Sequence, residues 1–581
     1  MQGHAKSSKA LLTRRVRVLC GFFIIAALLL IVRLYFIQVV HGASYRLQAA
    51  GQYAEQNPEI GHRGSIFFTG RDDTLVAAAV MQAGWRIAID PRQIEDAQMV
   101  YKELSRITPI DSDAFFASAA KKSDPYEEVA TRLDEQTAKT LRARKIPGVI
   151  LVSERWRFYP GKGLAAQTLG FVGYQQGDTS KSGVYGLEKM YENTLAEDTG
   201  GLYVNPFAEI FTNIRSALST DPAGHKGSIV TSIEPKVQEE IETTLDSVMK
   251  QYGPKIAAGI VMDPHSGEIV ALAVRPGFDP NSYNTVENPA VYDNPLISGR
   301  YELGSIMKPL TMAAAIDSGA VTAVATYEDT GCIERSTFTI CNFDKKARGV
   351  VPVQRILNES LNVGASFLAD TMGYAVFSRY IRLYGLGEKT GVDLPAEVAG
   401  DLSPLGSGHG PAVNYDTAAF GQGISVSPIA MVRALSSLAN AGVLPQPHLV
   451  RAIKYQSGIT RTVPIAQGPQ VVKKETADTV TEMLIKVFDT GLMNGQFKMD
   501  HYSIAAKTGT AQIPKQGGGY IEGDMYLHSF FGYFPAREPK FIVFLLAIEP
   551  HGQRYASATL ARPFNDIAMF LINYYNIPPD R

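Results

Sequence analysis

Three short motifs contain the residues whose chemistry could transfer an acyl group, and the first is Ser305-Ile-Met-Lys308. On a helix, a serine and a lysine three positions apart share one face, a single turn from each other. Pro309 is tolerated best in the first turn of a helix, so we expect the helix to begin near Ser305. A serine there lies beside free backbone N–H groups and the positive end of the helix dipole, and a neutral lysine amine can take its proton. The motif indicates a nucleophilic serine with an adjacent base.

The other two motifs are Ser360-Leu-Asn362 and Lys507-Thr-Gly-Thr510. A lysine followed by two threonine hydroxyls on a strand edge offers a carboxylate both charge and hydrogen bonds. Gly509 between the threonines lets a substrate approach the backbone closely. Each motif alone is weak evidence, but the three in this order form the set that one group of serine acyl-transfer enzymes uses.

Two of these patterns also occur elsewhere in the chain, among them in Ser118-Ala-Ala-Lys121 and in Lys389-Thr-Gly391. About one or two Ser-x-x-Lys matches should arise by chance in a chain of this length. The first lies in a hydrophilic stretch without a companion motif, which is typical of a solvated helix face. The second follows an amphipathic helix closed by glycines and lacks the second threonine, so we expect a loop there.

The overall composition argues against two other classes of protein. The 56 Lys and Arg residues almost balance the 57 Asp and Glu residues, which gives no support to nucleic-acid binding. None of the three cysteines lies in a Cys-x-x-Cys pair, and the ten histidines form no His-Glu-x-x-His motif. We therefore expect neither a metal site nor a cofactor.

The amino-terminal segment has the pattern of a membrane anchor. Basic residues precede an apolar run that extends from Val18 to Val40, interrupted by Arg33 near its end. This length can span ~30 Å of hydrocarbon, and an arginine near a helix end can reach the headgroups. We expect a cytoplasmic tail over residues 1–17, a transmembrane helix over 18–40 and the rest of the chain outside, although a cleaved signal peptide fits the same pattern.

Cys332 and Cys341 belong to the part expected outside the cytoplasm. An oxidising compartment permits a disulfide, and the residues between the two cysteines could form a hairpin. The pattern fits two free thiols that lie too far apart to bridge nearly as well.

Apolar periodicity divides the rest of the chain into two regions. Residues 41–220 mix short strands with charge-rich helical stretches such as Glu127–Arg144. Residues 228–581 begin with a strand and a helix that starts at Pro235 and ends at Gly253. The run from Phe541 to Ile548 is apolar on both faces, which predicts a central, buried strand. This order of elements indicates an α/β or α+β domain with one sheet covered by helices.

With the three motifs, the chain resembles the class B penicillin-binding proteins, the monofunctional peptidoglycan D,D-transpeptidases. The resemblance implies an α/β (α+β) serine acyltransferase domain of the penicillin-binding-protein and β-lactamase type over 228–581, one transmembrane helix, and a mixed α+β pedestal of the dimerisation type over 41–220. Arg63-Gly-Ser-Ile66 and Arg157-Phe-Tyr-Pro160 resemble the pedestal of the family, but Phe68-Thr69 replaces its usual Asp-Arg. Further matches are Asp263–Ala273, Phe278–Asn281, Tyr301–Ser305, Gly421–Ile424 and Ser529–Pro535.

The resemblance also implies a role for each motif residue. Ser305 would attack the carbonyl between the last two D-alanines of a stem peptide, Lys308 would be the general base, and Ser360 would relay the proton to the leaving D-alanine. Asn362 would hold the substrate amide. The terminal carboxylate would be bound by Lys507, Thr508, Gly509 and Thr510. β-Lactam antibiotics would acylate the same serine.

Asn362, where many elongation enzymes have aspartate, favours the septal, FtsI-like type of the family. No glycosyltransferase domain precedes the pedestal, so a glycan polymerase of the SEDS family and divisome proteins are the expected partners, at the cytoplasmic membrane. The alternatives are an elongation-type transpeptidase, or a β-lactamase or D,D-carboxypeptidase that passes the acyl group to water. Leu361 argues against a class A β-lactamase, which has aspartate there.

Overall fold

The computed structural model describes residues 63–175, 180–196, 226–336, 338–406, 408–515, 519–521, 523 and 525–581. The expected cytoplasmic tail and transmembrane helix, residues 1–17 and 18–40, lie outside this part. Within the described residues, no helix is both long and apolar enough to cross a membrane. The chain divides into two compact units, one built from Ala83–Glu154 and one from His62–Gln82, Arg155–Glu197 and Ser219–Arg581. Residues of the expected pedestal, 41–220, contribute to both units.

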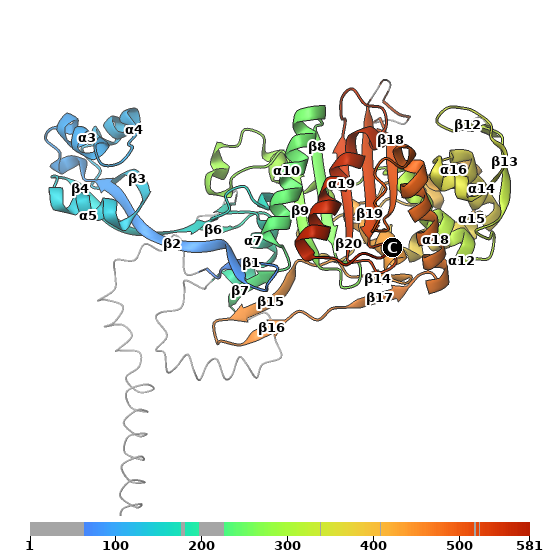
Figure 1. The fold of residues 1–581 in the computed structure, drawn as a ribbon. Coiled ribbons are helices and arrows are strands. Elements are labelled where there is room, and N and C mark those ends of the chain that lie inside the picture. Colours follow the sequence, from blue (N-terminus) through green and yellow to red (C-terminus); the bar gives the residue numbers. More distant parts are fainter. Residues whose placement is uncertain are drawn as a thin grey trace, which may run out of the picture. The chain divides into compact units, whose positions relative to one another are not determined.

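A five-stranded sheet forms the centre of the second unit, and every neighbouring pair of its strands is antiparallel (Figure 1). Its order is β18 (Ala505–Gln512), β19 (Tyr526–Phe534), β20 (Phe541–Ile548), β8 (Ile256–Met262) and β9 (Ile269–Arg275). Because successive side chains of a strand point to opposite faces, Phe544 of β20 joins one hydrophobic core and Leu545 the other. The prediction of a central strand at Phe541–Ile548, buried on both faces, is confirmed.

Two long helices, α10 (Pro235–Tyr252) and α19 (Ala556–Tyr575), cover one face of this sheet (Figure 1). The expected helix of residues 235–253 is α10, and its apolar side chains recur at helical spacing in the core beneath it. Gly253 ends the helix with a φ of 54°, a conformation that favours glycine. The ring of Phe564 on α19 stacks on Phe530 of β19, 4.6 Å between centroids.

Helices form most of the core on the other face of the sheet. They are α11 (Pro295–Ser298), the 3₁₀ turn η6 (Gly304–Met307), α12 (Lys308–Asp317), α13 (Gln354–Asn358), α14 (Asn362–Met372), α15 (Tyr374–Leu383), α16 (Ala412–Ala418), α17 (Pro428–Ala439) and α18 (Lys474–Lys486). Short strand pairs lie among them: β10 (Thr326–Asp329) with β13 (Gly349–Pro352), β11 (Cys332–Arg335) with β12 (Phe338–Cys341), and β14 (Val443–Pro445) with β17 (Gln467–Gln470).

The β11–β12 hairpin contains a disulfide between Cys332 and Cys341, with an S–S distance of 2.09 Å. The two cysteines are directly opposite each other in the antiparallel register. The sequence was compatible with either a disulfide or two free thiols, and the structure contains the disulfide.

A second sheet in this unit contains β16 (Thr460–Thr462), β15 (Val450–Tyr455), β7 (Gly227–Thr231), β1 (Ile66–Thr69) and the first part of β2 (Leu75–Ile89). Near it lie β5 (Val172–Tyr174), β6 (Lys181–Gly183), α6 (Ala166–Leu169), α7 (Gly186–Met190) and α8 (Glu192–Leu195). Arg63 and Arg157, from the two motifs that resemble the pedestal of the family, both donate to the buried Glu188 on α7, at 2.7 and 2.6 Å. Burial by itself would raise the pKa of Glu188, but the charges of the two arginines outweigh it and hold the pKa below its usual value.

Glu188→Gln should strongly destabilise this unit. It removes the negative charge shared by Arg63 and Arg157, both almost fully buried, and breaking a buried ion pair typically costs ~3 to 5 kcal/mol. Thermal and urea unfolding of the variant measure this loss. Glu239→Gln is the matched control, because the Lys236–Glu239 pair is exposed and such pairs contribute ~1 kcal/mol or less. Equal stability of the two variants would contradict the prediction.

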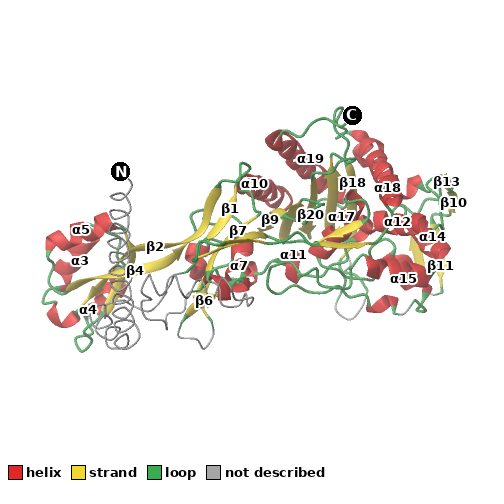
Figure 2. Cartoon of the chain, turned by 90° about the horizontal axis from the view of Figure 1, so that it is seen from below, coloured by secondary structure: helices red, strands yellow, loops and turns green. Residues whose placement is uncertain are grey.

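The first unit contains α3 (Ala97–Ser105), α4 (Ser112–Ala119), β3 (Glu127–Leu133), α5 (Glu135–Arg144) and most of β4 (Val149–Phe158), with strands and helices packed together (Figure 2). Here the prediction of a helix over Glu127–Arg144 is wrong for its first half. Residues 127–133 form a strand that pairs antiparallel with β2, and only the second half is helical. Pairing with a distant strand outweighs the weak local helix preference.

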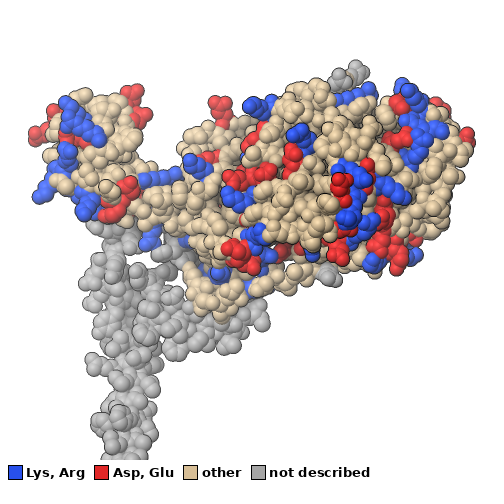
Figure 3. Space-filling view, viewed as in Figure 1, with Lys and Arg blue, Asp and Glu red and all other residues tan. Residues whose placement is uncertain are grey.

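On the face shown in Figure 3, acidic and basic side chains are interspersed over the second unit. This distribution agrees with the near-equal numbers of the two charge types in the sequence.

Candidate active site

Ser305 lies in η6, directly before α12, and is half-buried. The expected helix start near Ser305 is confirmed, with its first turn tightened to a 3₁₀ turn. Gly304 has a φ of 65° and packs so closely on the third motif that a Cβ there would lie 2.9 Å from the Thr510 carbonyl oxygen. The glycine thus permits the serine turn to lie against strand β18.

Lys308 begins α12 and is completely buried. Its Nζ lies 2.5 Å from the Ser360 carbonyl oxygen, 2.8 Å from Asn362 Oδ1 and 3.2 Å from Ser360 Oγ. Burial, and then the positive charge of Lys507, lower the pKa of Lys308 well below its usual value. A neutral amine can donate its two N–H groups to the carbonyl oxygens and keep a lone pair for a hydroxyl proton.

Ser360 connects the two lysines. Its Oγ lies 3.2 Å from Lys308 Nζ and 3.1 Å from Lys507 Nζ. The residue has a φ of 56°, a conformation that is uncommon for a residue with a side chain and costs on the order of 1 to 3 kcal/mol. The surrounding hydrogen bonds hold Ser360 in this conformation, which places its hydroxyl between the two amines.

Asn362 is the first residue of α14, and both ends of its amide are bound. Oδ1 accepts from Lys308, and Nδ2 donates to the Cys341 carbonyl oxygen at 3.0 Å. The disulfide hairpin therefore fixes the orientation of the asparagine amide, an arrangement that the motif spacing alone did not indicate.

Lys507 lies on β18, the edge strand of the five-stranded sheet, as expected for the third motif. Its Nζ also donates to the Thr508 carbonyl oxygen at 3.0 Å. Burial lowers the pKa of Lys507 to about 7. Since the pKa values of two coupled lysines are both lowered, one amine can be neutral while the other keeps its proton near neutral pH.

The three motifs meet in one cleft of about 650 Å³. Ser305, Ser360, Asn362, Thr508 and Thr510 all line it. Its walls are rich in aromatic side chains, among them Phe338, Phe343, Phe420, Tyr520, Tyr526 and Tyr555. The cleft thus combines a nucleophile and a base with an edge strand whose side chains can bind a carboxylate. Such a cleft can perform acyl transfer from a peptide that pairs with the edge strand.

The second occurrences of the motifs lie elsewhere. Ser118 and Lys121 both bind Glu127 in the first unit, at 2.9 and 2.7 Å. Lys389-Thr-Gly391 lies in a loop, where the Thr390 hydroxyl donates to Glu397. Neither lines the cleft.

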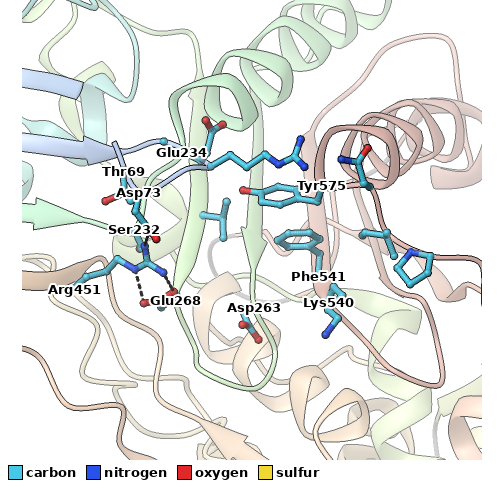
Figure 4. A pocket seen from close by; sticks show the side chains of 16 residues that line it. Thr69, Asp73, Ser232, Glu234, Asp263, Glu268, Arg451, Lys540, Phe541 and Tyr575 are labelled. Carbon is cyan, nitrogen blue, oxygen red and sulfur yellow. Dashed lines mark hydrogen bonds and ion pairs between the residues drawn. The ribbon is translucent and has the colours of Figure 1, made fainter. Parts of the chain in front are cut away.

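A separate hollow of about 360 Å³ lies among β1, β7 and the carboxy-terminal residues (Figure 4). Arg451 crosses part of it and donates to both oxygens of Glu268, at 2.7 and 2.9 Å. No residue of the three motifs is among the described residues that line this hollow.

Comparisons with known proteins agree with this geometry. Residues 257–569 match the penicillin-binding protein transpeptidase domain, and residues 59–209 match the penicillin-binding protein dimerisation domain. Stage V sporulation protein D of Bacillus subtilis is 28% identical over 570 residues, covering 96% of this chain and 85% of the relative. Peptidoglycan D,D-transpeptidase FtsI of Escherichia coli is 26% identical, covering 97% of this chain and 92% of the relative.

Two solved structures share the fold. Penicillin binding protein 2X of Streptococcus thermophilus has a TM-score of 0.71 at 22% identity, covering 89% of this chain and 81% of its own. Penicillin binding protein 3 of Mycobacterium tuberculosis, complexed with aztreonam, has a TM-score of 0.67 at 22% identity, covering 90% of this chain and 98% of its own. The transpeptidase-domain match covers more than half of the chain and contains all three motifs. The chain therefore belongs to the class B penicillin-binding proteins and is a peptidoglycan D,D-transpeptidase that acts on D-Ala-D-Ala.

Proposed function

We propose that this transpeptidase cross-links septal peptidoglycan during cell division, through an acyl-enzyme on Ser305. The observation that supports Ser305 most directly is the hydrogen-bonded set beside it, in which Ser360 Oγ lies within 3.2 Å of two buried lysines with lowered pKa values. Such a cluster of perturbed groups in a cleft is typical of a catalytic site.

In the proposed acylation step, Ser305 Oγ attacks the carbonyl carbon between the two D-alanines while Lys308 takes the hydroxyl proton. The N–H groups of Ser305 and Thr510 stabilise the oxyanion, a contribution of ~3 to 4 kcal/mol per donor in comparable enzymes. The C–N bond then breaks, and the proton passes from Lys308 through Ser360 to the leaving D-alanine amine. Asn362 holds the substrate amide.

In the second step, an amine on a neighbouring strand attacks the ester carbon. Its surplus proton passes to Lys308, the new peptide bond forms, and the ester C–O bond breaks. Ser305 Oγ then takes the proton from Lys308 and becomes a hydroxyl again. Bonds and protons balance in this step, so it needs no oxidant.

The terminal carboxylate is proposed to lie on β18, held by Lys507, Thr508, Gly509 and Thr510. Gly509 lets β18 pack closely on the residues behind it, since a Cβ there would lie 2.3 Å from Ser529 Oγ and 2.5 Å from the Leu303 carbonyl oxygen. The close packing behind the glycine keeps the strand against η6, with Thr508 and Thr510 both in the cleft.

The proposal includes attachment to the cytoplasmic membrane through residues 18–40, with the catalytic domain on the outer side. The apolar run and its basic flank support it. A SEDS-family polymerase would supply the glycan strands, and divisome proteins would recruit the complex.

Division rather than elongation is supported by Asn362 and by relatives named FtsI, although a sporulation protein is also among the relatives. We expect a fluorescent fusion of the full chain to collect at midcell in dividing cells of the native host. Uniform fluorescence along the sidewall would instead support the elongation type.

A further inference from the structure

We infer that Arg554 binds a second, non-terminal carboxylate of the acyl donor, so that the enzyme selects stem peptides and β-lactams with a negative charge beside the acyl group. The inference rests on the proposed acylation of Ser305. It assigns a specificity-determining contact to a residue that lies outside the three motifs.

Arg554 lies in the loop between β20 and α19, and this loop is fixed to the two strands that form the cleft edge. The Arg554 carbonyl oxygen accepts a hydrogen bond from Nε2 of the buried His528 at 3.1 Å. Two residues further along the chain, the Ala556 N–H donates to Thr510 Oγ1 at 3.0 Å. His528 is directly opposite Thr510 in the β18–β19 register. The loop thus has a defined place relative to the proposed carboxylate-binding threonine.

The guanidinium of Arg554 lies along one wall of the cleft. It is 5.7 Å from the ring centroid of Tyr555, which in turn contacts Phe343 edge to face at 5.9 Å. All three residues line the cleft, and Phe343 comes from the end of the disulfide hairpin. The stacked ring limits the positions of the guanidinium and leaves its N–H groups available.

The charge of Arg554 is not matched within the described part of the chain, where no carboxylate lies within ion-pair distance of it. Glu359 is the only acidic residue among the described residues that line the cleft. Its two carboxylate oxygens are already bound by Arg348 and Arg355. Arg554 therefore gives the cleft wall a positive charge that a ligand can neutralise.

The direction of the donor peptide places its earlier residues near this charge. With the terminal carboxylate at Lys507 and the scissile carbonyl at the Thr510 N–H, the preceding residues extend toward Gln512. Gln512 pairs with Tyr526, whose carbonyl oxygen accepts from the N–H of Glu549 at 2.9 Å, where the loop that carries Arg554 begins. A carboxylate on a residue before the two D-alanines can then accept both N–H groups of the guanidinium fork.

The test uses two penicillins that differ by one group. Carbenicillin is benzylpenicillin with an added carboxylate on the acyl side chain. This side chain occupies the position of the residue that precedes D-Ala-D-Ala in a stem peptide. The second-order rate constant for acylation of Ser305 is measured for both compounds with the full chain in detergent. Arg554→Gln should slow carbenicillin about tenfold, equivalent to ~1.4 kcal/mol, and leave benzylpenicillin within about twofold. Arg554→Lys should restore part of the carbenicillin rate because it keeps the charge without the fork.

Arg562→Gln is the matched control, because Arg562 is a largely exposed arginine on α19 that does not line the cleft, and both penicillins should react with it as with the unaltered chain. Equal slowing of both compounds by Arg554→Gln would show that Arg554 only shapes the loop and would overturn the inference, as would an unchanged carbenicillin rate. Absence of any benzylpenicillin adduct on the unaltered chain would instead refute the proposed function.

Discussion

Ser305→Ala should abolish formation of the penicilloyl adduct, because it removes the oxygen that forms the ester bond. The unaltered chain should gain one penicilloyl group per molecule, located by mass spectrometry on the tryptic peptide that contains Ser305. For an essential nucleophile the expected loss is on the order of 10⁶-fold in rate, below any detectable labelling.

Ser118→Ala is the control for the first prediction. Ser118 has the same Ser-x-x-Lys spacing, but its hydroxyl and Lys121 are both occupied by Glu127 in the other unit. This variant should label at the normal rate, and labelling of Ser118 itself would refute the assignment. The lifetime of the adduct separates the two reaction classes: a transferase should keep it for many minutes, whereas a hydrolase would regenerate free enzyme and consume penicillin.

Lys308→Arg should lower the acylation rate by ~10²- to 10⁴-fold, the usual contribution of a general base. Arginine keeps the positive charge but does not release its proton in proteins. Because the larger group enters a fully buried position, Lys308→Gln provides the companion variant: it is neutral, similar in length and still able to donate to the Ser360 carbonyl oxygen. Stopped-flow acylation, with thermal unfolding to verify the fold, measures both. Full activity of Lys308→Gln would eliminate this lysine as the base.

The lowered pKa of Lys308 also sets the sign of the pH dependence. The amine is neutral above its pKa, so acylation should fall as pH drops through that value and the ammonium ion forms. Lys507 has the opposite effect on the acylation rate, because its ammonium form supplies the positive charge that binds the carboxylate. Its pKa is about 7, so the acylation rate should fall again as the pH rises above that value. The second-order acylation constant should therefore be bell-shaped in pH, and Lys507→Gln should remove the alkaline decline while lowering the maximum. An unchanged alkaline limb in that variant would contradict the assigned role.

Local sequence patterns were sufficient for the main elements of the catalytic unit. Pro309 indicated the helix start beside Ser305, the spacing of apolar residues indicated α10, and the two-sided apolar run indicated β20 as the central strand. These features depend on interactions between near neighbours in the sequence or on burial of a whole segment. Both are visible in the spacing of apolar residues and in the residues that cap helices. The helix prediction for residues 127–133 was wrong because their strand partner, β2, is far away in the sequence and local patterns do not reveal the pairing.

The sequence by itself thus determined which residues of the site are chemically competent: a serine three positions before a lysine, a Ser-x-Asn motif and a Lys-Thr-Gly-Thr strand. Only the tertiary structure decided how they act together. Burial of both lysines lowers their pKa values, Ser360 lies between them, and the Cys341 carbonyl oxygen orients Asn362. Desolvation and hydrogen bonds between distant segments exist only once the chain has folded, so no local pattern can encode them.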